Sequence, residues 1–241
     1  MWKQIKAAVY TGTKNLYKSM VPAVKSLICN SDVDKIYLLI EDDEFPYEMP
    51  KDIVEVRNLS KQKYFKPDGP NMNSQFTYMA MMRAALAKEF PELDRILSLD
   101  VDTLVVNDIK NLWNVDLDDY YLASCEEPSA TRSHGYWYSN IGVALYNLEK
   151  LRDGKCDEVI EALNTKKYRY LEQDVFNELC QDKILPLDKR YNSNDFCGFS
   201  WHPFVVHYAG IKYWQEEYEY KKWDKTSWKE IFDYRKRRYE K

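Results

Sequence analysis

The 241-residue sequence has few glycines and prolines, no long apolar run and no excess of basic residues. Seven glycines and nine prolines are too few for a low-complexity linker, and we find no internal repeat. No stretch approaches the roughly 18 apolar residues of a membrane span. The net charge of −4 argues against general nucleic-acid binding, which needs a basic face. Hydrophobic residues make up 45% of the sequence, which is enough for the core of one domain.

The N-terminus and the cysteines point to a reducing compartment. The opening stretch, MWKQIKAAVYTGTKNLY, carries charges and lacks the apolar centre of a signal peptide or anchor. Five cysteines are an odd number without C-x-x-C spacing, so we expect reduced thiols and a cytoplasmic location. The cysteines are Cys29, Cys125, Cys156, Cys180 and Cys197.

Apolar periodicity predicts alternating strands and helices in the first hundred residues. The predicted strands cover residues 7–12, 35–41, 52–59, 95–99, 120–126, 141–147 and 204–210. The predicted helices cover residues 15–29, 74–89, 156–163 and 171–180. Ser74 is the expected N-cap of the second helix. This alternation favours an α/β fold with a Rossmann-like, mostly parallel central sheet and helices on both faces.

The segment RILSLDVDTL places two carboxylates directly after a buried strand. In an extended chain Asp100 and Asp102 point to the same side, and Val101 points to the other. Two converging carboxylates repel each other unless a cation lies between them, and oxygen ligands suit Mg²⁺ or Mn²⁺. Two solvated aspartates or a helix cap are the simpler alternatives. Among enzymes, haloacid dehalogenase-type phosphohydrolases and nucleotide-sugar glycosyltransferases both use such a pair.

Four motifs in order resemble the family 8 retaining glycosyltransferases, the glycogenin-like and bacterial lipopolysaccharide galactosyl- and glucosyltransferase group. They are LDVDTLVVNDIKNLWNVDL, YSNIGVALYNLEKLR, LEQDVFN and HYAGIKYW, and the resemblance spans about residues 7–214. It implies a GT-A fold and metal-dependent, retaining transfer of a hexose from UDP-glucose or UDP-galactose. The acceptor would be a glycan, a lipid-linked molecule or a protein. The phosphohydrolase alternative fails because its motif usually opens the domain.

The resemblance also implies the roles of individual residues. Asp100, Asp102 and His207 would bind Mn²⁺ (or Mg²⁺), and an imidazole beside carboxylates fits Mn²⁺ better than Ca²⁺. Gly210 and Lys212 would approach the diphosphate. The complete donor-binding set is Thr11, Thr13, Tyr17, Arg83, Val101, Asn140, Gly210 and Lys212. Thr11, Thr13 and Tyr17 are assigned to the uracil and ribose, and Asn140 to the sugar hydroxyls.

The motif LEQDVFN carries the expected catalytic residues. The resemblance places Gln173 and Asp174 nearest the anomeric carbon, while Glu172 replaces an aspartate of the family pattern. Because an amide is a poor nucleophile, we expect same-face attack through an oxocarbenium-like ion pair, with the departing phosphate taking the acceptor proton. Ile141 is larger than the family residue and is expected to affect which sugar fits. Glu126 and Glu127 are further candidates for sugar contact.

We expect a glycosyltransferase domain at residues 1–212 and a helical, basic and aromatic tail at residues 213–241. Tyr, Trp, Lys and Arg suit the inner membrane face, but a terminal helix packed on the domain explains the same composition. A protein of the same fold that binds a nucleotide sugar or glycan without turnover is the alternative function. Three departures from the family pattern keep this alternative open. They are Ile141, Glu172 and the single residue between Gly210 and Lys212, where the family has two.

Overall fold

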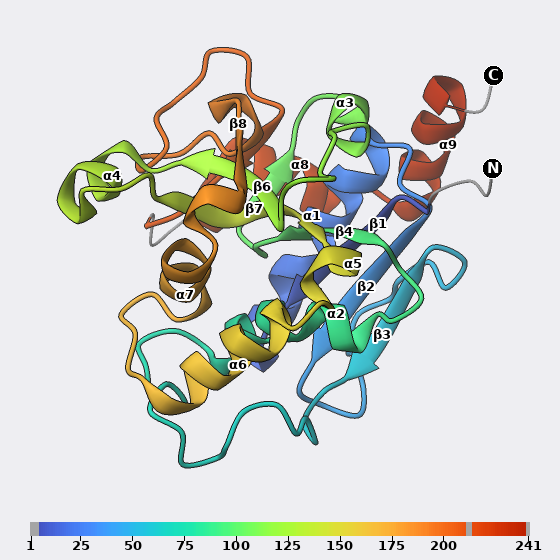
Figure 1. Ribbon diagram of the computed structural model, residues 1–241. Coiled ribbons are helices and arrows are strands. Elements are labelled where there is room, and N and C mark those ends of the chain that lie inside the picture. The colour runs from blue at the N-terminus through green and yellow to red at the C-terminus, as the bar shows by residue number, and fades with distance from the viewer. Residues whose placement is uncertain (1–4, 211–213, 240–241) are drawn as a thin grey trace.

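The computed structural model describes residues 5–210 and 214–239, and its centre is a seven-stranded sheet in the order β3-β2-β1-β4-β7-β6-β8 (Figure 1). The strands are β1 (Ala7–Thr11), β2 (Lys35–Ile40), β3 (Val54–Asn58), β4 (Arg95–Leu99), β6 (Leu122–Glu126), β7 (Ser139–Asn147) and β8 (Ile184–Leu187). Adjacent strands of this sheet are parallel except where β7 pairs with β4 and β6. The predicted mostly parallel α/β sheet is therefore confirmed.

The reversed direction of β7 determines which of its residues lie at the edge of the sheet where β4 ends. Because β7 is antiparallel to β4, its first residues lie beside the end of β4, and Leu99 is opposite Val143. The backbone N–H of Asp100 donates to the Gly142 carbonyl at 2.8 Å. The start of the YSNIG motif thus meets the end of the RILSLD motif.

Helices cover both faces of the sheet, as predicted (Figure 1). The α-helices are α1 (Tyr17–Asn30), α2 (Leu86–Glu89), α3 (Lys110–Trp113), α4 (Pro128–His134), α5 (Leu148–Leu151), α6 (Lys155–Thr165), α7 (Glu172–Leu179), α8 (Tyr218–Lys225) and α9 (Trp228–Tyr239). In β1, Ala8 and Tyr10 join the core under α1, α8 and α9, whereas Ala7 and Val9 join the core under α6 and α7. This alternation is the side-chain period of a strand buried on both faces.

Short 3₁₀ helices connect several elements, and one of them corrects the predicted helix 74–89. They are η1 (Lys14–Leu16), η2 (Tyr78–Ala85), η3 (Gln181–Lys183), η4 (Lys189–Tyr191) and η5 (Trp214–Glu216). The predicted helix begins only at Tyr78, with Thr77 Oγ1 accepting from Met79 N at 3.2 Å. Ser74 is not its cap, because its hydroxyl is engaged in a local turn with the Phe76 backbone.

The late strand is shorter than predicted and lies outside the main sheet. β9 (Val205–His207) pairs antiparallel with β5 (Thr103–Val105), and Thr103 stands opposite His207. The strand ends at His207, and Gly210, with a φ of 82°, lies in the turn that replaces the end of the predicted strand. This two-stranded sheet joins the segment after Asp102 to the segment that carries His207.

The C-terminal helices pack on the domain. Ile231 of α9 is fully buried, and Arg235 donates to the Ser31 and Val33 carbonyls at 3.2 and 2.7 Å, just beyond α1. These cationic contacts satisfy carbonyls near a helix C-terminus. Within residues 5–210 and 214–239, no helix is long and apolar enough to cross a membrane. All five cysteines are buried and free.

Candidate active site

The pairing of β5 with β9 brings Asp100, Asp102 and His207 together. Each offers one ligand atom, and these atoms lie within 4.8 Å of one another. His207 Nε2 lies 3.6 Å from Asp100 Oδ2 and 3.3 Å from Asp102 Oδ1. The Tyr208 N–H donates to the Asp102 carbonyl at 3.0 Å, which fixes the two segments next to the cluster. Two carboxylates and an imidazole form a donor set suited to Mn²⁺ or Mg²⁺.

Gly142 leaves the room in which this cluster converges. A Cβ at this position would lie 2.3 Å from His207 Cε1 and 2.7 Å from Asp100 Oδ2. Both separations are far below van der Waals contact, so a side chain would push the imidazole and the carboxylate away. The glycine of the YSNIG motif therefore lets the ligand atoms approach from two different elements.

Arg83 of η2 holds Asp100 from the opposite side. Its guanidinium donates to Asp100 Oδ1 at 2.6 Å and to the Ile141 carbonyl at 3.2 Å, and it forms an ion pair with Glu172. Burial disfavours its charge, but Asp100 and Glu172 outweigh burial and raise the pKa of Arg83. Arg83 thus stays cationic beside the proposed donor site.

Two adjoining cavities, of about 370 and 340 Å³, share the wall formed by Arg83, Asp100 and Asp102. Asn140 and Gly210 line the larger one, and Thr11, Thr13 and Val101 line the smaller one. Val101 is nevertheless mostly buried in the core. Six of the eight residues assigned to the donor from the sequence therefore line these two adjoining cavities. They are Thr11, Thr13, Arg83, Val101, Asn140 and Gly210.

The two remaining assignments, Tyr17 and Lys212, meet different outcomes. The Tyr17 ring is buried against Phe45, and its hydroxyl accepts from the Glu41 N–H at 3.0 Å. Tyr17 is not among the described residues that line the two cavities. Its ring is part of the core instead. Lys212 lies outside the described residues. Ile141 joins the core under α6 and α7 and is not among the described residues that line the two cavities, so its effect on which sugar fits stays a prediction.

On α7, Gln173 lines the larger cavity. Asp174 is not among the described residues that line it. Gln173 Oε1 accepts from the Ile141 N–H at 3.2 Å, and its Nε2 donates to Tyr138 Oη at the same distance. Asp174 accepts from Tyr138 Oη at 2.6 Å and from the Tyr170 N–H at 2.8 Å. Gln173 therefore faces the cavity directly, whereas Asp174 supports the hydroxyl that contacts Gln173.

Charges are strongly coupled around the cluster. Burial disfavours the charged form of His207, but Asp102 and Asp100 outweigh it and raise the pKa of the imidazole. Burial acts against the charge of Asp102 too, yet His207 holds the pKa of that carboxyl below its usual value. Burial also raises the pKa of Glu127, which lines the cavity.

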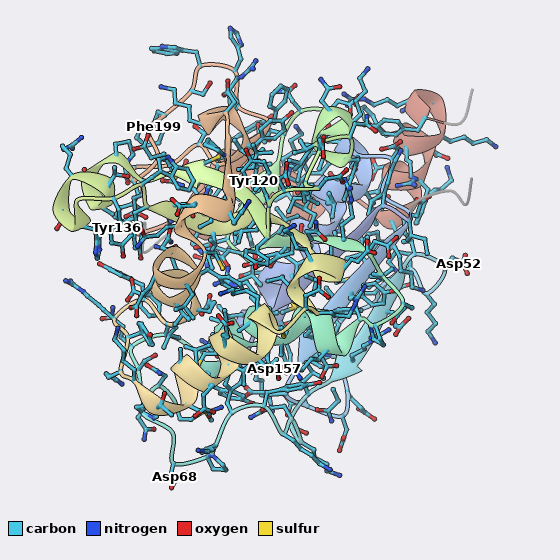
Figure 2. All side chains as sticks on the ribbon, in the orientation of Figure 1. Asp52, Asp68, Tyr120, Tyr136, Asp157 and Phe199 are labelled. Atoms are coloured by element: carbon cyan, nitrogen blue, oxygen red, sulfur yellow. The ribbon has the colours of Figure 1, made fainter. Side chains whose placement is uncertain are left out.

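Several residues at the site were not predicted from the sequence. Phe76, Tyr170 and Phe196 line the larger cavity, while Phe199, on the same loop as Phe196, is 64% exposed at the outer surface (Figure 2). Asn192 and Asn194 lie behind His207, and Asn192 Oδ1 is 2.8 Å from His207 Nδ1. The N-x-N repeat in RYNSND was their only sequence signal.

Comparison with solved structures shows the fold. The galactosyltransferase LgtC, solved with donor and acceptor sugar analogues, gives a TM-score of 0.70 at 18% identity and covers 95% of this chain and 99% of LgtC. The glycosyltransferase GlyE of Streptococcus pneumoniae gives 0.70 at 21% identity, covering 96% of this chain and 63% of GlyE. These likenesses agree with the GT-A fold expected from the sequence.

Sequence comparison shows the family. A putative glycosyltransferase of Haemophilus influenzae is 30% identical over 125 residues, which are 46% of this chain and 37% of the relative. In sequence, GlyE is 26% identical over 199 residues, 78% of this chain and 47% of the relative, so the chain spans less than half of these relatives. The profile of glycosyl transferase family 8 matches residues 9–218. Because this match covers most of the chain, the protein belongs to glycosyl transferase family 8.

Proposed function

We propose that this protein transfers a hexose, glucose or galactose, from a UDP-linked donor to a saccharide, lipid-linked or protein acceptor with retention of configuration. The observation that carries the proposal is the convergence of Asp100, Asp102 and His207, of which the two acids line both adjoining cavities and His207 lines the larger one. One cavity has room for a nucleoside beside Thr11 and Thr13, and the other for a sugar beside Asn140 and Gln173. LgtC, which has this fold, was solved with donor and acceptor sugar analogues.

The proposed metal-binding residues are Asp100, Asp102 and His207, with Mn²⁺ or Mg²⁺ as the ion. Bound there, the ion supplies Lewis-acid stabilisation of the charge on a leaving diphosphate. Arg83 orients Asp100 through their 2.6 Å contact and adds positive charge at the same wall. Gly210, which lines the larger cavity, allows close backbone approach to the diphosphate.

The proposed catalytic residues lie on α7. Gln173 presents an amide to the larger cavity, where its dipole stabilises positive charge on the anomeric carbon. Asp174 acts through Tyr138, which it holds by the 2.6 Å hydrogen bond. Same-face attack then leaves the acceptor proton to the departing phosphate. A sugar–Asp174 adduct detected by mass spectrometry in a slow variant would contradict this mechanism.

Donor hydrolysis in the presence of Mn²⁺ tests the function. Release of UDP from UDP-glucose or UDP-galactose should fall by at least about 100-fold in Asp102→Asn, the range for removing a group that stabilises transition-state charge. Asp116→Asn is the matched control, because Asp116 is exposed and its contact with the Asp118 N–H suits an amide equally well. Donor binding without turnover in the wild-type protein would favour the binding-protein alternative.

We also propose a peripheral membrane contact through the C-terminal helices. Tyr218, Tyr234, Lys236 and Arg237 are exposed there, and such residues suit an anionic interface. Lys236→Glu/Arg237→Glu should lower co-sedimentation with anionic vesicles at least about tenfold, since each surface cation contributes about 1 kcal/mol. Truncation is unsuitable because it removes the buried Ile231. Equal sedimentation of the double variant and the wild type would contradict the contact.

A further inference from the structure

A chain of three buried asparagine amides lies against His207. Asn192 is fully buried, Asn194 is 1% exposed and Asn140 is 7% exposed. Asn192 forms the middle of the chain and touches both of the others as well as the imidazole. An amide can face a neighbour with its oxygen or with its NH₂ group, so the orientation of this chain determines what His207 meets.

Backbone groups at the first end fix the direction of Asn194. Its Oδ1 accepts from the Phe196 and Cys197 N–H groups at 2.7 and 2.8 Å. Because a backbone N–H can only donate, the oxygen must lie on that side. Its Nδ2 then faces Asn192, where it donates to Oδ1 at 2.8 Å and to the backbone carbonyl at 3.1 Å.

The other end fixes the same direction independently. Asn140 Oδ1 accepts from the Gly142 N–H at 3.1 Å, so the group that meets it from Asn192 must be a donor. Asn192 Nδ2 supplies that donor at 2.9 Å. Reversing the Asn192 amide would set oxygen against oxygen at Asn140 and NH₂ against NH₂ at Asn194.

The oxygen of Asn192 is therefore the atom that lies 2.8 Å from His207 Nδ1. A carbonyl oxygen only accepts, so Nδ1 must carry a proton. Asn194 Nδ2, 3.4 Å from the same nitrogen, is then in van der Waals contact with it. In the neutral ring the lone pair belongs to Nε2, which faces Asp100 and Asp102 at 3.6 and 3.3 Å.

We infer that Asn192 is a positioning residue that fixes the tautomer of His207 and thereby leaves Nε2 free as a metal ligand. The inference rests on the proposed metal site and adds the residue that prepares it. The same amide holds Asn140 on the wall of the larger cavity, so one side chain aligns the metal cluster and the sugar pocket. Outer hydrogen-bond partners of ligating histidines commonly have this role.

The test is ¹⁵N–¹H NMR of the imidazoles in the metal-free protein, which has three histidines. In the wild type we expect neutral His207 to carry its proton on Nδ1. Asn192→Leu removes the acceptor at similar size, and the proton should move to Nε2, where Asp102 can accept it. Asn192→Asp keeps an acceptor and should keep the proton on Nδ1. Asn71→Leu, which removes another buried asparagine that bonds to backbone groups, is the matched control and should leave the tautomer unchanged.

Affinity for Mn²⁺ alone, measured by titration calorimetry, gives the second readout. It should fall about 10- to 100-fold in Asn192→Leu and stay near the wild-type value in Asn71→Leu. A wild-type neutral ring protonated at Nε2 overturns the inference, as does Asn192→Leu with an unchanged tautomer and affinity. If Asn192→Leu does not fold, the wild-type and Asn192→Asp spectra decide, since a neutral ring with its proton on Nε2 in either protein overturns the inference. Failure of donor turnover in the wild type rejects the proposed function and leaves the tautomer result standing.

Discussion

Gly142 shows how an absent side chain controls a site at the scale of a residue. Asp100 follows β4, and His207 ends β9. Their side chains could not approach each other if residue 142 of β7 carried a Cβ. Asn140 lines the larger cavity and Gly142 faces the cluster, while Ile141 joins the core under α6 and α7. Three successive residues of β7 therefore provide an amide (Asn140), a core side chain (Ile141) and a position without a side chain (Gly142).

Gly142→Ala is expected to lower Mn²⁺ affinity by more than about tenfold. The added methyl would overlap His207 Cε1 at 2.3 Å, so the ring must shift away from Asp100. Overpacking should also cost about 1–3 kcal/mol of unfolding free energy. Gly154→Ala is the control: its φ of 98° strains an alanine, but no other atom of the described residues lies within 4 Å of the added Cβ beyond the two chain neighbours. Only stability should therefore fall. Calorimetry and urea unfolding measure the two effects, and unchanged affinity in Gly142→Ala would count against a tight cluster.

At the scale of elements, α9 is part of the folded domain. Ile231 lies in the core with α1, and Trp228 packs against that core. The cations Arg235 and Arg238 reach residues at the end of α1. Pairs such as Lys229–Asp233 and Lys222–Glu219 neutralise part of the tail's positive charge. The basic composition that the sequence displays is thus partly used in structural contacts.

Ile231→Ala should reduce the free energy of unfolding by about 2–5 kcal/mol, the usual cost of deleting a fully buried isoleucine side chain. Phe232→Ala is the matched control on the next residue, which is 37% exposed and should change stability much less. Urea midpoints at constant m value report both changes. Equal effects of the two substitutions would mean that α9 does not pack as described.

Local patterns predicted the strands β1, β2, β4 and β6 and the helices α1, α6 and α7 to within a few residues. They did not predict β5 or β8, nor that β9 leaves the main sheet, because strands of three or four residues carry little periodicity. The direction of β7 depends on its partners, which no local pattern specifies. Among site residues, Asp100 and Asp102 could be singled out because their spacing is local, whereas Asn192 could not, because its role depends on His207 and Asn140 across the fold.

At the scale of the whole molecule, all five cysteines are sequestered. Burial raises the pKa of Cys29 and Cys156 to about 11 and of Cys180 and Cys197 to about 12, and that of Cys125 well above its ordinary value. None is therefore a ready thiolate nucleophile near neutral pH.

The folded protein should react slowly with a thiol reagent such as DTNB at pH 8, and all five thiols should react at once in denaturant. Burial excludes the reagent and the raised pKa values suppress the thiolate, so the reaction follows unfolding. Release of the coloured thiol product against time measures the number of reactive groups. Saturation of the protein with Mn²⁺ should slow the reaction of the thiols further if the ion stabilises the fold. Rapid labelling of one thiol in the native protein would show an opening that the structure does not have.

The pairing of β5 with β9 also has a consequence for biosynthesis. Nearly half of the chain separates Asp102 from His207, and the two become neighbours only when β9 docks. A nascent polypeptide on the ribosome therefore displays both acids long before the histidine has been made. Under the proposed function, the complete Asp100–Asp102–His207 cluster forms only at that late docking step, so we expect a half-translated molecule to lack donor turnover.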